Sequence, residues 1–525
     1  MQKEGGTEMM TRRKVAIIAI SLVLLSSMMA GCIEQKPQEH ASIATQEDQV
    51  LTIGYAGDLK LSGDPSKISR SIPKFAVLER LLEYDVEKDE FVPSLAESWD
   101  IKDGGKTIVF HLKRGIKFSD GTTMDASAVK FTYDLLHIKN PDLAPESSEI
   151  IDDYTIAFHF SEGSILNLAR LQDVHGLGVM SPNSVDPPGD INGTLNTLIG
   201  TGPFKVVEYK KDQYGVFEPN PYWYERMGLT PKLKKLVVKT IPDEDTRVMA
   251  LRSGDVDVLI DEYHGGYDYT PRNQLNGLVK DGFKVYTKKL PFTWELILNY
   301  RKEPFSDVRL RKAVAYAVNR DEIVNIFGGW VRPADTGIFP PEAPGIKRAN
   351  IKYEYNPEKA RAILRELGKE GMTVDMIVDK SQGDQILVAQ LLQQQLKDIG
   401  INLNLEVLER GAYREKRNSG DYDMMIYYFG GSERCFYMRI FWRFLPPDKP
   451  YKYMKPEVVK AAQGIVKEFD KSKREQKFIE LYRAFYDTMG VVPLYHEVVV
   501  VAANPKVEGI LFEHSEPRFY AVSIK

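Results

Sequence analysis

The sequence predicts an α/β protein, and three observations support this class. Segments with the two-residue alternation of strands and segments with helical spacing follow one another along most of the chain. No internal repeat is evident, so a solenoid is not expected. The chain has 525 residues, which is more than a single hydrophobic core usually organises, so two or three lobes are possible.

The first 31 residues are predicted to be a signal peptide. Arg12, Arg13 and Lys14 precede an apolar run over residues 15–25. This run is too short to cross a bilayer, which takes ~20 residues, and fits the apolar region of a signal peptide. The paired arginines leave two export routes open, the general secretory route and the twin-arginine route.

The leader ends in Met-Ala-Gly-Cys, and this ending resembles the lipobox of bacterial and archaeal lipoproteins. In such proteins the cysteine becomes the lipidated first residue of the mature chain. The resemblance predicts lipidation at Cys32, which would hold the protein on the outer face of the cell membrane. The alternative is an ordinary secretion signal with an incidental cysteine. Residues 32–49 are polar and without periodicity, so we expect a flexible tether there.

The elements of the body follow in order. In the N-terminal part, alternation predicts strands over residues 50–55, 107–112, 155–160, 233–240 and 256–260. Helical spacing predicts helices over 71–84, 126–137 and 243–253, with Asp125 as the N-cap of the second. In the C-terminal part we expect helices over 308–317, 357–367, 385–399 and 474–489, and strands over 401–408 and 491–502. Pro357 and Gly400 mark a helix start and a helix end.

Composition and motifs exclude several classes of protein. The net charge of −4 gives no global field for nucleic acid, so no nucleic-acid partner is expected. The two cysteines, Cys32 and Cys435, exclude a disulfide framework. Neither a Gly-x-Ser-x-Gly elbow nor a His-Glu-x-x-His motif occurs. We therefore expect no enzyme, no catalytic residue and no resident cofactor.

Several short motifs occur in a fixed order between residue 50 and the C-terminus. They are PSLAESW at 93–99, FHLKRGIKFSDG at 110–121, GTGPF at 200–204, NPYW at 220–223, FSDVRLRKAV at 305–314, YNPEKA at 355–360 and VPLY at 492–495. With these motifs the chain resembles the family 5 extracellular solute-binding proteins, the peptide and nickel group, and within it the nickel-binding branch most.

This resemblance implies a two-lobed periplasmic-binding-protein-like fold of class II, cluster C type, with a hinge between the lobes. Lobe I would cover residues 50–288, with an extra subdomain at about 82–198, and residues 497–525 would return to it. Lobe II would cover residues 289–496. The ligand would be engulfed between the lobes as they close.

The resemblance also implies a function. The protein would be the substrate-binding lipoprotein of an ABC importer, passing its ligand to the permease and ATPase subunits. The alternative is an adhesin or a chemosensory receptor that uses the same fold. If the protein serves an importer, a bound nickel chelate would be its transported ligand and not a cofactor.

Most motif residues also have a structural interpretation. Trp99, Phe118 and Trp223 are expected to be core anchors. Asp255 and Asp257 lie one residue apart, as metal ligands can, but they match a family turn and are interpreted as structural.

The ligand is expected to be a peptide or a nickel chelate. Peptide binders in this family carry an Asp that pairs with the peptide amine, and here Ser432 occupies that position, next to Glu433. This difference argues against binding of free peptide N-termini. Arg434 in the same loop could pair with a carboxylate or lie on the surface.

The remaining candidates are metal donors and aromatic walls. His175 is the strongest imidazole candidate for nickel, with a structural histidine as the alternative. Cys435 is either a soft donor or a small buried hydrophobic residue. No protein metal site can be assigned. The candidates for aromatic walls of the cleft are Tyr55, Trp294, Tyr413, Tyr428 and Tyr437.

Overall fold

The computed structural model describes residues 49–68, 72–139, 141, 144–173, 178–260, 272–428, 435–445, 455–514 and 516–525. The leader, the predicted lipidation site Cys32 and two ligand candidates, His175 and Arg434, lie outside these residues. Within the ranges just given, no helix combines the length and the apolar character needed to cross a membrane.

A large sheet runs through the protein. Among the described residues it has eleven strands, in the order β10-β11-β12-β1-β13-β19-β14-β18-β16-β17, with β15 pairing separately with β19. In its first part, β1 (Val50–Tyr55) lies between β12 (Lys235–Thr240) and β13 (Val258–Ile260), and both pairings are parallel. Leu51, Ile53 and Tyr55 are fully buried, and because alternate residues of a strand point to the same side, this face of β1 packs on the core.

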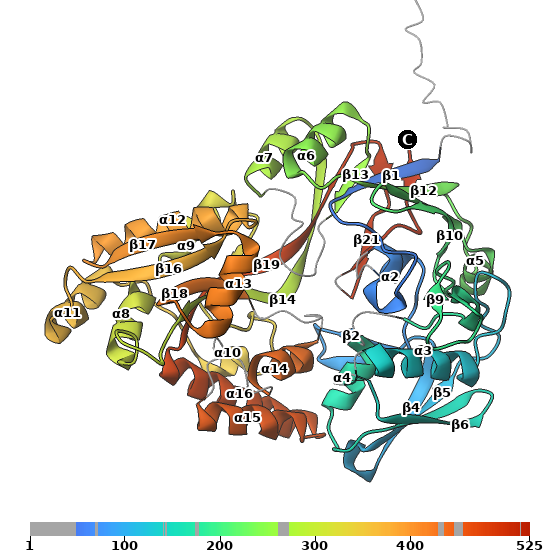
Figure 1. The fold of residues 1–525 in the computed structure, drawn as a ribbon, viewed down its shortest axis with the longest axis horizontal. Helices are drawn as coiled ribbons and strands as arrows, with labels where there is room; N and C mark the ends of the chain where they lie inside the picture. Colours follow the sequence, from blue (N-terminus) through green and yellow to red (C-terminus); the bar gives the residue numbers. More distant parts are fainter. Residues whose placement is uncertain are drawn as a thin grey trace, which may run out of the picture. The chain divides into compact units, whose positions relative to one another are not determined.

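Two long strands connect the two parts of this sheet. β14 (Lys284–Leu298) and β19 (Val491–Ala503) run antiparallel beside each other (Figure 1). One end of β19 pairs with β13 of the first part, and the other end of β14 pairs with β18 (Met424–Tyr428) of the second. The register shifts between Lys289 and Thr293, so the ladder is interrupted in the middle.

The second part of the sheet has its own core. β18 and β17 (Asn402–Leu408) flank β16 (Thr373–Asp379) in parallel. A hydrophobic cluster joins these strands to the helices around them. The helices are α8 (Val308–Ala317), α9 (Arg320–Ile326), α11 (Pro357–Leu367) and α12 (Gly383–Asp398). Helix α13 (Arg410–Ser419) follows β17, and its buried Tyr413 belongs to the other large hydrophobic cluster. This arrangement of two α/β lobes confirms the predicted fold class.

A separate four-stranded sheet is formed by residues between 96 and 159. Its order is β4 (Ala96–Lys102), β5 (Thr107–Leu112), β7 (Thr155–His159) and β6 (Ser147–Asp152). Helix α3 (Ala126–Lys139) lies close to it (Figure 1). The backbone N–H of Ala128 donates to the Asp125 carboxylate at 3.0 Å, so Asp125 caps this helix as predicted.

Three C-terminal helices, α14 (Phe436–Phe444), α15 (Pro456–Val466) and α16 (Lys471–Thr488), contact residues from the N-terminal part of the chain. The Val466 carbonyl accepts from the backbone N–H of Ile165 at 2.9 Å and from the Ser164 hydroxyl at 2.7 Å. Both donors lie at the start of α4 (Leu166–Asp173). The predicted lobe boundaries at 288/289 and 496/497 fall inside β14 and β19, and they stay a prediction.

The remaining elements are short. They are β2 (Leu82–Asp85), β3 (Glu90–Pro93), β8 (Val185–Asp186), β9 (Thr194–Leu195), β10 (Phe204–Lys210), β11 (Tyr214–Pro219), α5 (Pro221–Met227), α6 (Glu244–Ser253), α7 (Arg272–Lys280), β15 (Arg332–Pro333), α10 (Ile346–Ala349), β20 (Val507–Glu508), β21 (Leu511–Glu513), β22 (Glu516–Arg518), β23 (Ser523–Ile524), the short α2 (Ile72–Ala76) and three one-turn 3₁₀ helices at Pro65–Lys67, Asp103–Gly105 and Pro182–Ser184.

The predicted helix over residues 71–84 is wrong in most of its length. Helix α2 ends at Ala76, and the chain enters β2 at Leu82. The Val77 carbonyl accepts from the backbone N–H of Gly202 at 2.9 Å, so it takes part in a tertiary contact instead of a helical one. A Cβ on Gly202 would lie 2.8 Å from that carbonyl oxygen, which is too close. This close approach explains why the second glycine of the GTGPF motif has no side chain.

Candidate ligand-binding site

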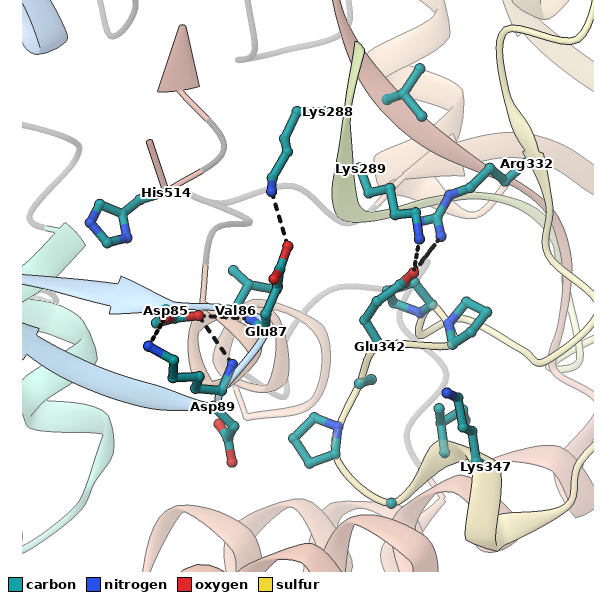
Figure 2. Close-up of a pocket in the computed structure, with 18 of the residues that line it drawn as sticks. Asp85, Val86, Glu87, Asp89, Lys288, Lys289, Arg332, Glu342, Lys347 and His514 are labelled. Atoms are coloured by element: carbon teal, nitrogen blue, oxygen red, sulfur yellow. Dashed lines mark hydrogen bonds and ion pairs between the residues drawn. The ribbon is translucent and has the colours of Figure 1, made fainter. Parts of the chain in front are cut away.

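A cavity of about 1300 Å³ lies beside the crossing strands. Its volume exceeds the roughly 300–1,000 Å³ of most small-molecule sites. The lining comes from Thr287 to Lys289 of β14, the β2–β3 turn over 85–89, the segments 329–332 and 340–348, and α16. Charged side chains enter it from opposite sides (Figure 2). The cavity can therefore hold a polar ligand of considerable size.

One side of the cavity, which we call the basic wall, carries Lys289, Arg332, Glu342 and Lys347 (Figure 2). Arg348, the next residue after Lys347, also lines the cavity and is counted with this wall. The Lys289 ammonium lies 3.0 Å from the Glu342 carboxylate. Nη1 of Arg332 donates to both oxygens of the same carboxylate, at 2.9 and 3.0 Å. β15 positions this arginine, because Arg332 pairs with His496 of β19. The Glu342 carboxylate therefore keeps the Lys289 ammonium and the Arg332 guanidinium close to each other.

The ionisation of Glu342 reflects these neighbours. Partial burial acts to raise its pKa, but the hydrogen bond from Lys289 and the charge of Arg332 outweigh it and lower the pKa below its ordinary value. Glu342 is therefore a carboxylate in the folded protein at neutral pH. Farther along the same wall, Arg348 pairs with Glu475 of α16 at 3.1 Å.

The opposite side, the hairpin wall, is the turn between β2 and β3. The Asp85 carboxylate accepts from the backbone N–H groups of Glu87 and Lys88, at 3.0 and 3.1 Å, and so fixes the turn. Lys88 also pairs with Asp85 at 3.2 Å. Glu87 projects into the cavity and contacts Lys288 of β14 at 3.0 Å. The charges of this wall are largely compensated by neighbours.

Asp89 fastens the hairpin wall to the C-terminal helices. Its carboxylate accepts from the hydroxyl of Tyr437 of α14 at 2.8 Å and from the hydroxyl of Tyr84. Nε of Arg474 of α16 donates to the Tyr437 hydroxyl at 2.6 Å. Burial is the largest influence on Asp89 and raises its pKa, although the two tyrosines and Arg474 oppose it. The Lys471 ammonium adds a hydrogen bond to the Lys88 carbonyl at 2.6 Å.

Two of the sequence-predicted aromatic candidates meet at the crossing strands. The Trp294 and Tyr428 rings lie 4.8 Å apart, and Tyr495 stacks near Trp294 at 6.2 Å. The Trp294 side chain is almost fully buried, and its indole N–H donates to Glu497 at 3.1 Å. Glu497 also accepts from Arg272 at 2.9 Å. We call Trp294, Tyr428 and Tyr495 the hinge aromatic cluster.

The other aromatic candidates lie elsewhere. Tyr55 is buried at the end of β1, and Tyr413 is buried with its hydroxyl donating to the Ile426 carbonyl at 3.1 Å. Tyr437 bonds to Asp89, which itself lines the cavity. None of the five aromatic candidates is a lining residue of this cavity. Their contact with a ligand stays a prediction, as do the roles of His175 and Arg434.

The motif residues mostly have the structural role expected of them. Phe118 and Trp223 are buried, and Trp99 packs against the core while remaining partly exposed. Asp257 accepts from the Thr52 backbone N–H and pairs with Lys506, each at 2.8 Å. Cys435 is fully buried. Within the described residues, no group of three or more His, Cys, Asp or Glu side chains is arranged to hold a metal ion.

Sequence reasoning missed the residues of the basic wall. Lys289, Arg332, Glu342 and Lys347 belong to no motif, and charged residues on their own usually indicate a solvated surface. The one local feature is the Pro-Pro-Glu-Ala-Pro-Gly run at 340–345, which fixes an irregular segment beside the cavity. Only the fold brings these four side chains together.

Two α/β lobes that share a pair of crossing strands, with a large charged cavity beside those strands, define the class of two-lobed solute-binding proteins. More particularly, the chain belongs to the bacterial extracellular solute-binding proteins, family 5. The model of the middle region of that family matches residues 90–441, which is more than half of the chain.

Curated relatives with different ligands match over similar lengths. The dipeptide-binding protein of Escherichia coli K12 is 26% identical over 453 residues, covering 79% of each chain. The nickel-binding periplasmic protein of the same strain is 25% identical over 463 residues, covering 83% of this chain and 86% of its own.

Solved structures resemble the whole body. NikA from Brucella suis in complex with Fe(III)-EDTA has a TM-score of 0.79 at 22% identity, covering 91% of this chain and all of the other. DppA from Helicobacter pylori in complex with the peptide STSA has a TM-score of 0.69 at 24% identity, covering 90% and 98%. Because both identities are below 25%, these structural matches are evidence for the fold alone.

Proposed function

We propose that this protein is the substrate-binding lipoprotein of an ABC importer, which captures a peptide or a nickel chelate and delivers it to the permease and ATPase subunits. The observation that carries the proposal is the large cavity beside the crossing strands, with charged groups contributed by the β2–β3 turn on one side and by residues 329–348 on the other. These two walls belong to the proposed lobes I and II, divided at 288/289 and 496/497.

The proposed mechanism is closure around the solute. A ligand that touches both walls binds the closed form more tightly than the open form, so it shifts the population toward closure. Closure removes water and strengthens each polar contact inside. The register shift between Lys289 and Thr293 is a suitable hinge, because the β14–β19 ladder is already interrupted there.

Both solute classes have support in the relatives. The dipeptide-binding and nickel-binding proteins of Escherichia coli match this chain at similar identity and coverage. The volume of about 1300 Å³ is sufficient for a short peptide or a metal chelate. The hinge aromatic cluster is proposed to support the cleft, with the half-buried Tyr428 as the ring that can reach a ligand.

Small-angle X-ray scattering tests the capture step. We expect the radius of gyration to fall when the protein is titrated with a pool of random tripeptides or with Fe(III)-EDTA. Closure is a rigid-body motion of whole lobes, so its effect on the scattering curve is global. Curves that remain superimposable with both probes, at concentrations up to millimolar, would contradict the proposal.

The lipid anchor is proposed from the sequence alone. Cys32→Ala removes the thiol that would carry the lipid. We expect the variant to leave the membrane fraction and to bind tripeptides or Fe(III)-EDTA with unchanged affinity, because the anchor precedes the folded body. Fractionation followed by immunoblotting measures the change, and membrane attachment equal to that of the wild type would refute the anchor.

A further inference from the structure

We propose that a lysine-rich face around residue 49 binds the anionic lipid headgroups of the membrane to which Cys32 would attach this protein. The inference rests on the proposed lipid anchor and assigns a second contact with the same membrane. We call this face the tether-side patch, and it consists of six lysines: Lys232, Lys234, Lys235, Lys284, Lys506 and Lys525.

The first argument is the place where the predicted tether joins the body. The backbone carbonyl of Gln49, the last residue of that tether, accepts from the backbone N–H of Lys234 at 2.8 Å. The Gln49 side chain bonds in both directions with the backbone of Ile524, at 2.7 and 2.9 Å. The backbone N–H of Lys525 donates to the Lys506 carbonyl at 2.9 Å. The tether therefore meets the body within the patch, where β1, β12 and the C-terminal end lie together (Figure 1).

The length of the tether keeps the patch near the bilayer. Residue 49 follows Cys32 by 17 positions, and a chain of that length spans at most about 60 Å. A lipid on Cys32 would therefore confine the patch to a thin layer above the headgroups, which raises the effective concentration of lipid at the patch. A bilayer with anionic lipids is the extended negative surface that the proposed anchor brings to this place.

The second argument is the charge of the patch. Among the described residues, two carboxylates form ion pairs with its lysines. Glu508 contacts Lys525 at 2.5 Å and Lys284 at 3.9 Å, and Asp257 contacts Lys506 at 2.8 Å. Six lysines against two carboxylates leave four positive side-chain charges in excess.

Half of the patch is available for a new contact. Lys232, Lys234 and Lys235 form no ion pair with any residue in the part of the chain that the structure describes, and the first two are exposed. The pKa of Glu508 is lowered, first by the hydrogen bond from Lys525 and also by the charge of Lys232, so Lys232 acts on the same carboxylate as the paired lysines. Each lysine close to an anionic membrane strengthens its attraction roughly fivefold.

The third argument is a pair of exposed apolar side chains beside the patch. Met227 ends α5 and is 52% exposed, and Leu229 in the loop that leads to Lys232 is 45% exposed. Helix α5 packs on the C-terminal segment, where the Tyr224 hydroxyl donates to the Tyr520 carbonyl at 3.1 Å. Large apolar side chains next to lysines are typical of surfaces that enter the headgroup region of a bilayer.

This contact would orient the body on the membrane. A lipid alone leaves the body free to turn at the end of its tether, whereas binding through the patch directs one face to the bilayer. None of the six lysines lines the large cavity, so the contact leaves solute capture open and can be tested separately from it.

Flotation with lipid vesicles tests the contact in the absence of the lipid anchor. The full chain with Cys32→Ala is mixed with vesicles of phosphatidylcholine alone or with an equal share of phosphatidylglycerol, and the bound fraction gives a partition coefficient. The patch variant adds three substitutions to this chain: Lys232→Gln, Lys234→Gln and Lys235→Gln. The control variant instead changes three exposed lysines outside the patch and the cavity: Lys369→Gln, Lys397→Gln and Lys467→Gln. All three chains share the same leader, so differences between them come from the lysines.

We expect the Cys32→Ala chain to partition about tenfold or more strongly onto the anionic vesicles than onto the neutral ones at low salt, and to lose this preference at high salt. The patch variant should bind the anionic vesicles about tenfold or more weakly. The control variant should stay within about twofold of the Cys32→Ala chain, because its lysines lie away from the patch. Melting temperatures close to that of the Cys32→Ala chain would show that the variants are folded.

Two results would overturn the patch. One is equal partitioning onto the two kinds of vesicle, or equal losses in the patch and control variants. The other concerns the tether as a competing occupant, because Glu47 and Asp48 directly precede Gln49. If anionic vesicles are bound only after Glu47→Gln/Asp48→Asn, the tether covers the patch and the proposal falls.

Failure of the anchor is recognised separately. If Cys32→Ala stays in the membrane fraction of cells, the lipid anchor falls, and the vesicle comparison between the patch and control variants still decides whether the patch binds anionic lipid. Solute capture is measured by scattering and depends on neither result.

Discussion

The hinge aromatic cluster and the charged cavity are two neighbouring regions that use their side chains in opposite ways. In the cluster, Trp294 is 3% exposed, and its ring and its indole N–H are both engaged by protein groups. In the cavity, Lys289 is 64% exposed and Glu87 is 74% exposed. Trp294 therefore contributes mainly to stability, while the cavity exposes charged side chains such as Lys289 and Glu87.

The largest loss of folding stability is expected from Trp294→Ala. Removing a buried indole leaves a cavity between Tyr428 and Tyr495 and removes one hydrogen bond to Glu497, so the free energy of unfolding should fall by about 3–5 kcal/mol. Urea unfolding measures this change.

The matched control is Trp330→Ala. Trp330 lines the cavity, is only partly buried, and donates its indole N–H to Asn276 at 3.0 Å. We expect a loss of about 1 kcal/mol in stability, together with weaker retention of the tripeptide pool. Equal losses of stability in the two variants would remove the distinction between cluster and cavity.

The next largest effect is expected from Asp89→Ala. The hydroxyls of Tyr84 and Tyr437 are buried, and each would lose its acceptor, so unfolding should become easier by about 2–4 kcal/mol. Asp89 has a φ of 51°, which by itself is unfavourable for alanine.

Asp212→Ala isolates that backbone contribution, because Asp212 has a φ of 57° in the exposed turn between β10 and β11. We expect a cost of about 1 kcal/mol there. If Asp89→Ala lowers the free energy of unfolding, measured with denaturant, by no more than Asp212→Ala does, the hydrogen bonds of Asp89 do not fasten the hairpin wall.

A smaller effect is expected from Glu342→Gln. The change removes the negative charge that Lys289 and Arg332 share, so binding of random tripeptides, which carry a C-terminal carboxylate, should rise a few-fold at low salt and less at high salt. Stability should change by less than about 1 kcal/mol, because the ion pairs are partly exposed. Weaker retention in the variant would show that Glu342 acts chiefly by ordering Lys289.

Asp89 of the hairpin wall and Glu342 of the basic wall should change the stability of the protein in opposite directions as the pH falls. Asp89 has a raised pKa, so the folded state binds its proton first, and stability gains from this group as the pH falls through that pKa. Glu342 has a lowered pKa, so its contribution is complete above the unfolded pKa and is lost as the pH falls through the folded one.

Urea unfolding between pH 7 and pH 3 can separate these two contributions. On acidification, Asp89→Asn should lose stability relative to the wild type, and Glu342→Gln should gain it. Asparagine suits this control because it tolerates the positive φ of position 89. Parallel pH profiles for both variants and the wild type would contradict these assignments.

Local sequence patterns predicted the α/β class and several elements, while the two-lobed architecture was predicted from the resemblance to the family. The helices at Val308–Ala317 and Pro357–Leu367 have the bounds expected from their periodicity, their caps and Pro357. The failure at 71–84 has a physical cause, since helical spacing cannot show that the backbone at Val77 bonds instead to Gly202, far away in the sequence. Tertiary hydrogen bonds of this kind leave no periodic trace.

The candidate site was much less predictable. Residue type singled out Trp294 and Tyr437, but their burial and their bonds to Glu497 and Asp89 depend on contacts between distant segments. Lys289 and Arg332 are 43 positions apart by their numbers, and β14, β19 and β15 bring them to one carboxylate. No sequence motif encodes that convergence, because each cation alone resembles an ordinary surface residue.

Native mass spectrometry of the protein purified from cells without refolding tests the central claim most directly. Capture of a solute in the cavity predicts that the wild type carries a bound peptide or metal chelate, and that Trp330→Ala, which changes the cavity lining, carries less of it. A wild type that carries neither a peptide nor a metal chelate, or equal amounts of the bound compound in both proteins, would contradict the account.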